Sequence, residues 1–370
     1  MPRINDSHYG HEGVIHLGLD VSKSSITVGI LRPGELEPDT ENIPHDEASI
    51  RRLIARFRDP SELRACYEAG PTGYELHRLL VSIGVETDVI APSLMPRIPG
   101  DHVKTDRRDA RRLARLHRAG ELTPIRVPTP TEEGVRDLCR ARQVAIKDRR
   151  RARQRLLSFL LRHNEVFRDG TTWTIRHRDW ISALHFEDKA TRAAFSFYRS
   201  NVVAQDATLE AITAELQPYF DDPLFADQTH RLGAYRGIDY LGSLTIASEV
   251  CDFKRFAHAG AFMGFGGLVP SEYSSGASVS RGHITHAGNV HVRTQLVESA
   301  WAYRHGPSVG VALKRRQDGL PKETIDRAWC AQIRLCSRFR RLDARKDSRN
   351  KVVIAIAREL AGFIYAEMTA

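Results

Sequence analysis

The sequence contains little cysteine and no long apolar run, and these absences exclude several classes of protein. Its five cysteines are scattered and odd in number, with no Cys-x-x-Cys pair, so neither a disulfide framework nor a structural zinc site is expected. No apolar run reaches the roughly 18 residues of a membrane-spanning helix, and the polar first residues lack the apolar segment of a signal peptide. We therefore expect a cytoplasmic protein that does not span a membrane.

The composition predicts folded domains and a polyanionic partner. Hydrophobic residues make up 41% of the 370 residues, which is enough for packed cores, and the length allows two domains joined by a helical spacer. Lys and Arg outnumber Asp and Glu by 55 to 46, giving a formal charge of +9. This excess favours a nucleic acid or an acidic membrane surface as the partner, and charge alone does not distinguish the two.

The first third of the chain, residues 14–125, has the pattern of an α/β domain. Strands are predicted where apolar residues alternate or run together, at 14–31 (two strands joined by a tight turn), 63–67 and 85–90. Helical spacing of apolar residues is found between and after these strands, at 47–58, 74–83 and 105–117. Strands that alternate with helices are typical of an α/β sheet.

Four acidic residues of this domain are placed so that their carboxylates can meet. Asp20 and Glu68 each stand where a predicted strand ends, and Asp106 and Asp109 lie about one turn apart on one face of a predicted helix. Such a cluster of hard oxygen ligands suits two Mg²⁺ ions about 4 Å apart, an arrangement that supports phosphodiester chemistry. Taken singly, Asp106 is equally explained by the helix dipole, Asp109 by a surface ion pair and Asp20 by a turn cap.

Residues 126–225 have the pattern of a basic, coiled-coil-like helical spacer. From Arg140 to Arg155 eight residues are Lys or Arg, and one acid, Asp148, opposes them. Like charges at this density repel one another unless a polyanion neutralises them, which favours phosphate binding; a solvated helix face is the alternative. A second helical stretch, 187–217, can return antiparallel to the first, whereas residues 165–185 give no clear pattern.

From residue 226 onward the pattern is mainly helical. Residues 231–250 predict a helix, a turn at Gly237 and a second helix, and residues 314–349 are again basic. Between them, residues 264–289 are rich in Gly, Ser and His and are predicted to form loops that carry function. We therefore expect a mainly α-helical domain over 226–370.

The motifs of the first domain resemble a known family. The segments LGLDVSK, YEAGPTGYELHRLL and VKTDRRDARRLA are similar, in this order, to the N-terminal domain of the DEDD transposases of the insertion-sequence one-ten and eleven-eleven group, which also contains pilin-gene invertases. The resemblance implies a ribonuclease-H-like α/β domain of the Holliday-junction-resolvase type. It further implies a catalytic tetrad that holds two Mg²⁺ ions, or Mn²⁺ in their place, through Asp20, Glu68, Asp106 and Asp109.

Residues 232–303 resemble the C-terminal transposase domain of the same family, through segments such as ASEVCDFKRF and FMGFGGLVPSEYSSGASVSRGHITHAGN. The family's nucleophilic serine, which holds a DNA strand as a phosphoserine, then matches Ser275, with Ser274 as its immediate competitor. Cationic groups that would stabilise phosphoryl charge stand close by in the sequence: Arg281, His283, His286 and Arg293.

The turn at Gly237 departs from the family's pattern. Where the family has Pro-Gly-Ile-Gly between two helices, this chain has Arg236-Gly237-Ile238-Asp239. The Asp239 carboxylate would repel a phosphate held by backbone N–H groups, and Arg236 would offset part of that repulsion. This departure weakens the expectation of backbone phosphate binding at the turn.

The resemblance also implies nucleic-acid partners and an assembly. Members of the family use a structured non-coding bridge RNA to choose target and donor DNA, and exchange between two duplexes implies a homodimer or homotetramer, associated with the bacterial nucleoid. The candidate nucleic-acid contacts are the following cations: Lys104, Arg140, Arg142, Lys147, Arg149, Arg150, Arg151, Arg153, Arg236, Arg281 and Arg293.

Three other functions fit part of the sequence. A structure-selective nuclease of the resolvase type would need the four acids but no serine. A sugar-kinase or actin-like ATPase would also begin with a strand, an Asp and a hairpin, but Val21-Ser22-Lys23 is not the small Gly-rich turn of that class, and no convincing nucleotide motif follows. A non-catalytic RNA-binding scaffold would have degraded sites, whereas all four acids are present.

Overall fold

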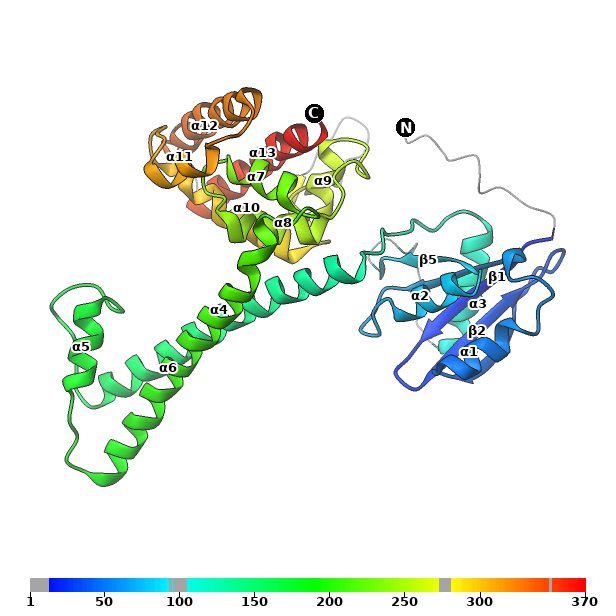
Figure 1. Ribbon diagram of the computed structural model, residues 1–370, viewed down its shortest axis with the longest axis horizontal. Helices are drawn as coiled ribbons and strands as arrows, with labels where there is room; N and C mark the ends of the chain where they lie inside the picture. Colours follow the sequence, from blue (N-terminus) through cyan, green and yellow to red (C-terminus); the bar gives the residue numbers. More distant parts are fainter. Residues whose placement is uncertain (1–12, 93–94, 96–104, 273–280, 346–347) are drawn as a thin grey trace. The chain divides into compact units, whose positions relative to one another are not determined.

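In the computed structural model the chain divides between Pro128 and Thr129 into two compact units (Figure 1). The structure describes residues 13–92, 95, 105–272, 281–345 and 348–370. The first unit contains the predicted α/β domain. The second contains both the predicted spacer and the predicted C-terminal domain.

The first unit is built on a five-stranded mixed sheet in the order β3-β2-β1-β4-β5. Its strands are β1 (Ile15–Val21), β2 (Ser25–Leu31), β3 (Asp39–Pro44), β4 (Leu63–Glu68) and β5 (Glu86–Ile90). The central strand β1 pairs antiparallel with β2 and parallel with β4. The four predicted strands are confirmed. Strand β3 was not predicted, because its segment DTENIP is polar and contributes no buried side chain.

Helices pack on both faces of this sheet. They are α1 (Glu47–Ile54), α2 (Glu75–Ser82) and α3 (Asp106–Arg118), with a 3-10 helix η2 (Pro60–Glu62). The alternation of β1 separates the two faces: Leu17 and Leu19 enter a core shared with α1 and α2, whereas Gly18 between them lies against α3. A Cβ at Gly18 would lie 2.3 Å from the carbonyl oxygen of Ala110. The glycine therefore allows α3 to approach the sheet closely.

Over its described residues, the second unit is helical apart from a two-stranded ribbon. α4 (Pro130–Arg162) and α6 (Lys189–Leu216) pack along each other, with α5 (Ile175–Ala183) at the end of the pair (Figure 1). Arg142 contacts Thr213 and Arg153 contacts Asp206, so the two helices form the predicted antiparallel hairpin. The remaining elements are η4 (Gln217–Phe220), α7 (Ala226–Gly233), α8 (Tyr240–Val250), α9 (Ala259–Phe265), β6 (Pro270–Glu272), β7 (Arg281–Ile284), α10 (Val290–Ala300), η5 (Trp301–Arg304), α11 (Val311–Gln317), α12 (Lys322–Asp343) and α13 (Arg349–Thr369).

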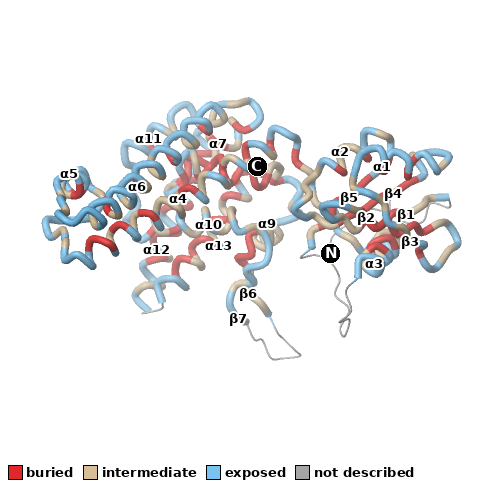
Figure 2. The backbone as a smooth tube through the Cα atoms, turned by 90° about the horizontal axis from the view of Figure 1, so that it is seen from below, coloured by how far each residue is buried: buried red, intermediate tan, exposed pale blue. Residues whose placement is uncertain are grey.

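Two hydrophobic cores stabilise the second unit, and buried residues follow the facing sides of its helices (Figure 2). In the hairpin, Leu156 of α4 packs with Phe195 of α6. Near the start of α4, Val135 and Cys139 instead enter the main core of the C-terminal helices. The spacer is therefore continuous with the C-terminal region, and the three-domain division at 125/126 and 225/226 stays a prediction. Among the described helices, none combines the length and apolar character needed to cross a membrane.

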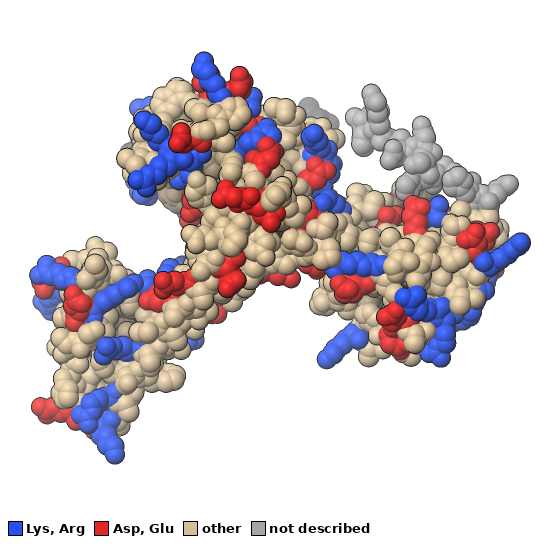
Figure 3. Space-filling model, viewed as in Figure 1, with Lys and Arg blue, Asp and Glu red and all other residues tan. Residues whose placement is uncertain are grey.

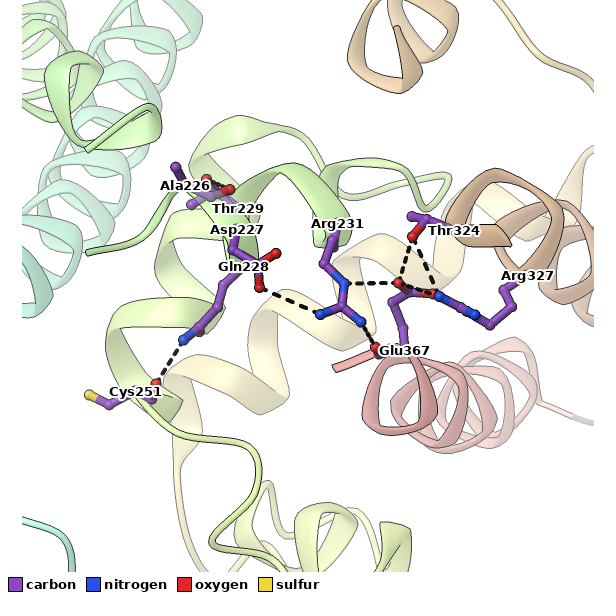
Figure 4. Close-up of polar contacts among 9 residues, drawn as sticks. All are labelled: Ala226, Asp227, Gln228, Thr229, Arg231, Cys251, Thr324, Arg327 and Glu367. Atoms are coloured by element: carbon purple, nitrogen blue, oxygen red, sulfur yellow. Dashed lines mark hydrogen bonds and ion pairs between the residues drawn. The ribbon is translucent and has the colours of Figure 1, made fainter. Parts of the chain in front are cut away.

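A buried ion cluster holds the end of α13 against α7 and α12 (Figure 4). Glu367 is fully buried, and its carboxylate accepts hydrogen bonds from Arg231, Arg327 and Thr324. Burial by itself would raise the pKa of Glu367, but these hydrogen bonds outweigh it and lower the pKa from 4.5 to about 2. The carboxylate is thus charged in the folded protein and links three helices.

Candidate active site and nucleic-acid interface

Asp20 and Glu68 occupy equivalent positions on two neighbouring parallel strands. The register pairs Leu19 of β1 with Tyr67 of β4, so Asp20 and Glu68 are the next pair along. Side chains at paired positions point to the same face of a sheet, with Cβ atoms about 5 Å apart. This is the face on which Gly18 lies against α3, because side chains two residues apart on a strand share a face. Both acids are half-buried, at the C-terminal edge of their strands.

Two contacts define the direction in which α3 crosses the sheet. Near the start of β1, the Nδ1 atom of His16 lies 3.4 Å from Nδ1 of His117, near the end of α3. Two residues further along β1, Gly18 lies against Ala110, in the first half of the helix. Helix α3 therefore runs antiparallel to β1, and its first turn reaches the end of the strand that carries Asp20.

The first turn of α3 supplies the other two acids. Its N-cap is Thr105, as predicted. Asp106 and Asp109 stand four residues before Ala110 and Leu113, which are buried against the sheet, so both continue the sheet-facing stripe of the helix. Asp109 is half-buried and Asp106 is exposed. All four predicted acids thus come to one edge of the sheet, which we call the carboxylate edge.

The donor chemistry of the carboxylate edge fits a divalent cation. Four carboxylates supply the hard oxygen atoms that Mg²⁺ and Mn²⁺ accept. Within the described residues, however, no three His, Cys, Asp or Glu side chains lie close enough together to form a ready-made metal group. Metal binding here would therefore require the carboxylates to turn toward one another from these positions.

The arginines of α4 fall into two sets, of which one contacts other parts of the second unit. Arg140 donates two hydrogen bonds, of 2.7 and 2.9 Å, to the buried carboxylate of Glu249. The rest of this inward set bonds to α6 of the hairpin: Arg142 to Thr213, and Arg149 and Arg153 to Asp206. These side chains stabilise helix packing, and their predicted role in nucleic-acid binding stays a prediction.

The other set on α4 is exposed and consists of Lys147, Arg150, Arg151, Arg155 and Arg162. Arg151, Arg155 and Arg162 recur at helical spacing and, with Tyr198 of α6, line a hollow of ≈ 320 Å³. Arg151 pairs with Asp148 at 3.1 Å. Figure 3 shows Lys and Arg side chains at the end of the hairpin near α5, with fewer acids among them. Arg155 and Arg162 were not among the candidate contacts named from the sequence, although their helical spacing from Arg151 is visible there.

The turn at Gly237 packs inside the second unit. Gly237 has a φ of +86°, and a Cβ there would lie 2.3 Å from the carbonyl oxygen of Ser299, so the position requires glycine. Asp239 caps α8 by accepting a 2.7 Å hydrogen bond from a backbone N–H of its first turn. Arg236 donates to the carbonyl oxygen of Gly306. Helix capping thus explains the acid that departs from the family's pattern.

Hydrogen bonds hold residues that follow the segment predicted to carry the nucleophile. Asn289 caps α10 and donates a 2.7 Å hydrogen bond to Glu249, the carboxylate that Arg140 also holds. Arg293 donates to the carbonyl oxygen of Gly266 at 2.9 Å, and burial lowers the pKa of this guanidinium. Outside the described residues lie Lys104, Ser274 and Ser275, and the side chain of Arg281.

Known proteins match both units of the chain. Residues 17–165 match a transposase family, and residues 229–309 match the transposase IS116/IS110/IS902 family. A putative transposase of Sinorhizobium fredii, y4qE, is 41% identical over 354 residues, which covers 95% of this chain and 87% of the relative. The transposase for insertion sequence element IS1533 of Leptospira borgpetersenii is 32% identical, over 90% of this chain and 97% of the relative. The transposase for insertion sequence element IS1111A of Coxiella burnetii is 23% identical, over 61% of this chain and 62% of the relative.

These matches establish first the class of the protein, an enzyme that cuts and rejoins DNA. Within that class, the chain belongs to the IS116/IS110/IS902 family of insertion-sequence transposases. The first matched segment contains all four acids of the carboxylate edge, and the second contains Ser275. The family resemblance drawn from the motifs is therefore confirmed.

Proposed function

We propose that this transposase moves its insertion sequence by metal-dependent cleavage and strand exchange through a phosphoserine, guided by a bridge RNA. The observation that supports this most directly is the register of the carboxylate edge. Asp20 and Glu68 directly follow the last paired residues of two parallel strands, Leu19 and Tyr67, and the direction of α3 supports a position of Asp106 and Asp109 at the same edge. When bound there, two Mg²⁺ or Mn²⁺ ions would neutralise the phosphoryl charge and polarise the reacting oxygens.

Ser275 supplies the attacking oxygen in this proposal. Its hydroxyl oxygen attacks the phosphorus of a DNA phosphodiester and gives up its proton, and the phosphorus–oxygen bond to the neighbouring deoxyribose breaks. The released deoxyribose oxygen takes up a proton and leaves as a hydroxyl. A hydroxyl of the second strand then attacks the phosphoserine, which rejoins DNA and restores the serine. One phosphate ester replaces another at each step, so strand exchange needs no ATP.

The proposed partners are target DNA, donor DNA and a non-coding bridge RNA in the cytoplasm, at the nucleoid. The exposed cations of α4 offer a surface for the sugar–phosphate backbone of either nucleic acid. The acids belong to the first unit and Ser275 to the second. The proposed reaction thus uses residues of both units, and exchange between two duplexes fits a homodimer or homotetramer.

The proposal is tested by recombination between donor and target plasmids, with RNA transcribed from the DNA that flanks the gene. Asp20→Ala, Asp109→Ala and Ser275→Ala should each abolish recombination, and Ser274→Ala should retain it. Asp39→Ala is the matched control, because Asp39 is an exposed acid of the same sheet on β3. Full activity in any of the first three variants would remove that residue from the site.

The carboxylate edge alone would also serve a structure-selective nuclease, which needs four acids and no serine. The two functions differ in the products of Ser275→Ala. A transposase should then neither cut nor rejoin its substrate, whereas a nuclease should still nick branched DNA in Mg²⁺ at the rate of the unmodified protein. The same assay without added metal shows whether either reaction depends on the divalent ion.

A further inference from the structure

We infer that a hollow beside the β6–β7 ribbon binds the sugar–phosphate backbone of the DNA strand that is cut. This hollow, the ribbon hollow, has a volume of ≈ 660 Å³ and lies between the ribbon and helices α12 and α13. Its described lining includes the cations Arg338, Lys351 and Arg358, the histidines His283 and His286, and no carboxylate. Arg338 pairs with Glu359, and the other two cations face a described lining that contains no carboxylate, which favours a polyanionic occupant.

The floor of the ribbon hollow is apolar, and two of its cations flank this floor. On α13, Lys351, Ile354 and Arg358 stand three and four residues apart, so they share one face of the helix. Lys351 and Arg358 are about 10 Å apart along the helix axis, with Ile354 between them, and both are exposed. This spacing suits contacts to phosphates on either side of a nucleoside, whose sugar and base would lie over the apolar residues.

The opposite wall of the ribbon hollow is held tightly. A Cβ at Gly282 would lie 2.4 Å from Oγ of Ser271, and that hydroxyl donates a 3.2 Å hydrogen bond to the carbonyl oxygen of His283. His286 has a φ of +54°, a strained backbone conformation of the kind that is found at functional sites. Strand β7 thus contributes His283 to the hollow, and the segment that follows this strand contributes His286.

The connection to the proposed chemistry lies in the order of the chain. Ser275 stands in the sequence between β6 and β7, and both strands contribute lining residues, among them Pro270 and Gly282. The inference therefore rests on the proposed function, in which Ser275 attacks a phosphodiester. It goes beyond that function by naming Lys351 and Arg358, from a helix that the motif analysis did not connect with the reaction.

The test compares Lys351→Gln/Arg358→Gln with a matched control, Lys314→Gln/Arg315→Gln. The control removes two exposed cations of α11, in the same unit, that do not line the ribbon hollow. Arg338 is left unchanged because it pairs with Glu359 at 2.8 Å. The measurement is equilibrium binding of the full chain to a nicked DNA duplex, as a function of salt concentration.

Loss of two phosphate contacts should reduce the slope of log K against log salt by about two, and should weaken binding about 50-fold near 0.1 M salt. A single neutral methylphosphonate beside the nick should weaken binding to the unmodified protein and have no further effect on the Lys351→Gln/Arg358→Gln variant. An unchanged slope, or an equal loss in the control, would overturn the inference. A larger loss for RNA of the same sequence than for DNA would overturn the assignment to DNA.

The same proteins separate this inference from the proposed function. Ser275→Ala should bind the nicked duplex with the slope of the unmodified protein, because the serine is not a charged contact. If the Lys351→Gln/Arg358→Gln variant has the smaller slope but the unmodified protein rejoins no DNA, the proposed function fails. The ribbon hollow then remains a binding site for the DNA backbone. If the unmodified protein recombines DNA but the Lys351→Gln/Arg358→Gln variant keeps its slope of log K against log salt, only the inference about the ribbon hollow fails.

Discussion

The two units place their acidic residues in opposite environments. In the first unit, four acids stand half-buried or exposed at one edge of a sheet. In the second, Glu249 and Glu367 are buried, and arginines hold each carboxylate. A buried carboxylate between arginines is already neutralised and serves packing, whereas carboxylates gathered at an accessible edge can bind a cation. The position in the fold, and not the residue type, thus distinguishes a candidate metal ligand from a structural acid.

The largest effect is expected on recombination, from a substitution that removes one charge of the carboxylate edge and keeps the fold. Asp20→Asn keeps the side-chain shape and removes the charge, so recombination should fall by on the order of 10³-fold or more. The first unit should stay folded at the assay temperature, because asparagine keeps the volume of the side chain and an oxygen that accepts hydrogen bonds. The recombination rate and the thermal unfolding of the same preparation check these two expectations. Loss of stability together with activity would contradict the assignment of Asp20 as a ligand.

The corresponding change in the second unit should act on stability first. Glu367→Gln leaves Arg231 and Arg327 beside an uncharged partner, which should lower the free energy of unfolding by about 3–5 kcal/mol. Denaturant unfolding at neutral pH measures this loss. Glu359→Gln is the control, because Glu359 also pairs with two arginines but lies nearer the surface; it should cost less.

The same residue predicts a dependence on pH. Since the folded pKa of Glu367 is about 2, below its ordinary value of 4.5, its contribution is fully present above pH 4.5 and is lost as pH falls toward 2. The second unit of the unmodified protein should lose stability over this window, and Glu367→Gln should show a shallower decline. Parallel curves for the two proteins would show that Glu367 is not the titrating group.

A smaller effect should follow from displacing α3. Gly18→Ala places a methyl group against the backbone of Ala110, which should cost about 1–3 kcal/mol of stability and move Asp106 and Asp109 away from Asp20. Gly34→Ala is a poor control because Gly34 has a positive φ, whereas Gly134→Ala meets open space on α4. Gly18→Ala should show a lower free energy of unfolding and a lower recombination rate. Gly134→Ala should keep the recombination rate and lose no stability, because alanine is favoured over glycine within a helix.

The smallest effects are expected from substitutions that compare the exposed and the inward sets of arginines on α4. Arg155→Gln/Arg162→Gln should reduce the salt dependence of nucleic-acid binding by about one to two in slope, without loss of stability. Arg149→Gln/Arg153→Gln removes two of the arginines that pair with Asp206 and leaves Arg178, and should instead lower the melting temperature. Equal binding losses for the two pairs would contradict the division into inward and exposed sets.

The sequence predicted much of the first unit because its signals are local. Local residues encode the strand that carries Asp20 near its end, the strand that ends at Glu68 and the helix that starts after Thr105. Their convergence follows from parallel pairing, which places the carboxyl ends of neighbouring strands at one edge. Strand β3 could not be predicted, because its polar segment pairs only where β2 offers a free edge.

The second unit was harder to predict because its decisive contacts join distant residues. Arg140 and Glu249 are 109 positions apart, so a row of arginines gave no sign of which ones point inward. Asp239 was interpreted as repelling phosphate, since its capping role depends on where α8 begins. The ribbon hollow combines residues from three segments of the chain, and no single motif contains it.

The central claim is that Ser275 carries the DNA strand between cutting and rejoining. Its most direct test is mass spectrometry of the protein after reaction with a nicked substrate that cannot be rejoined, followed by proteolysis and nuclease digestion. We predict a phosphodeoxynucleotide on Ser275, absent from Asp20→Ala and from reactions without divalent metal. Active recombination with no covalent adduct, or an adduct on a different side chain, would contradict it.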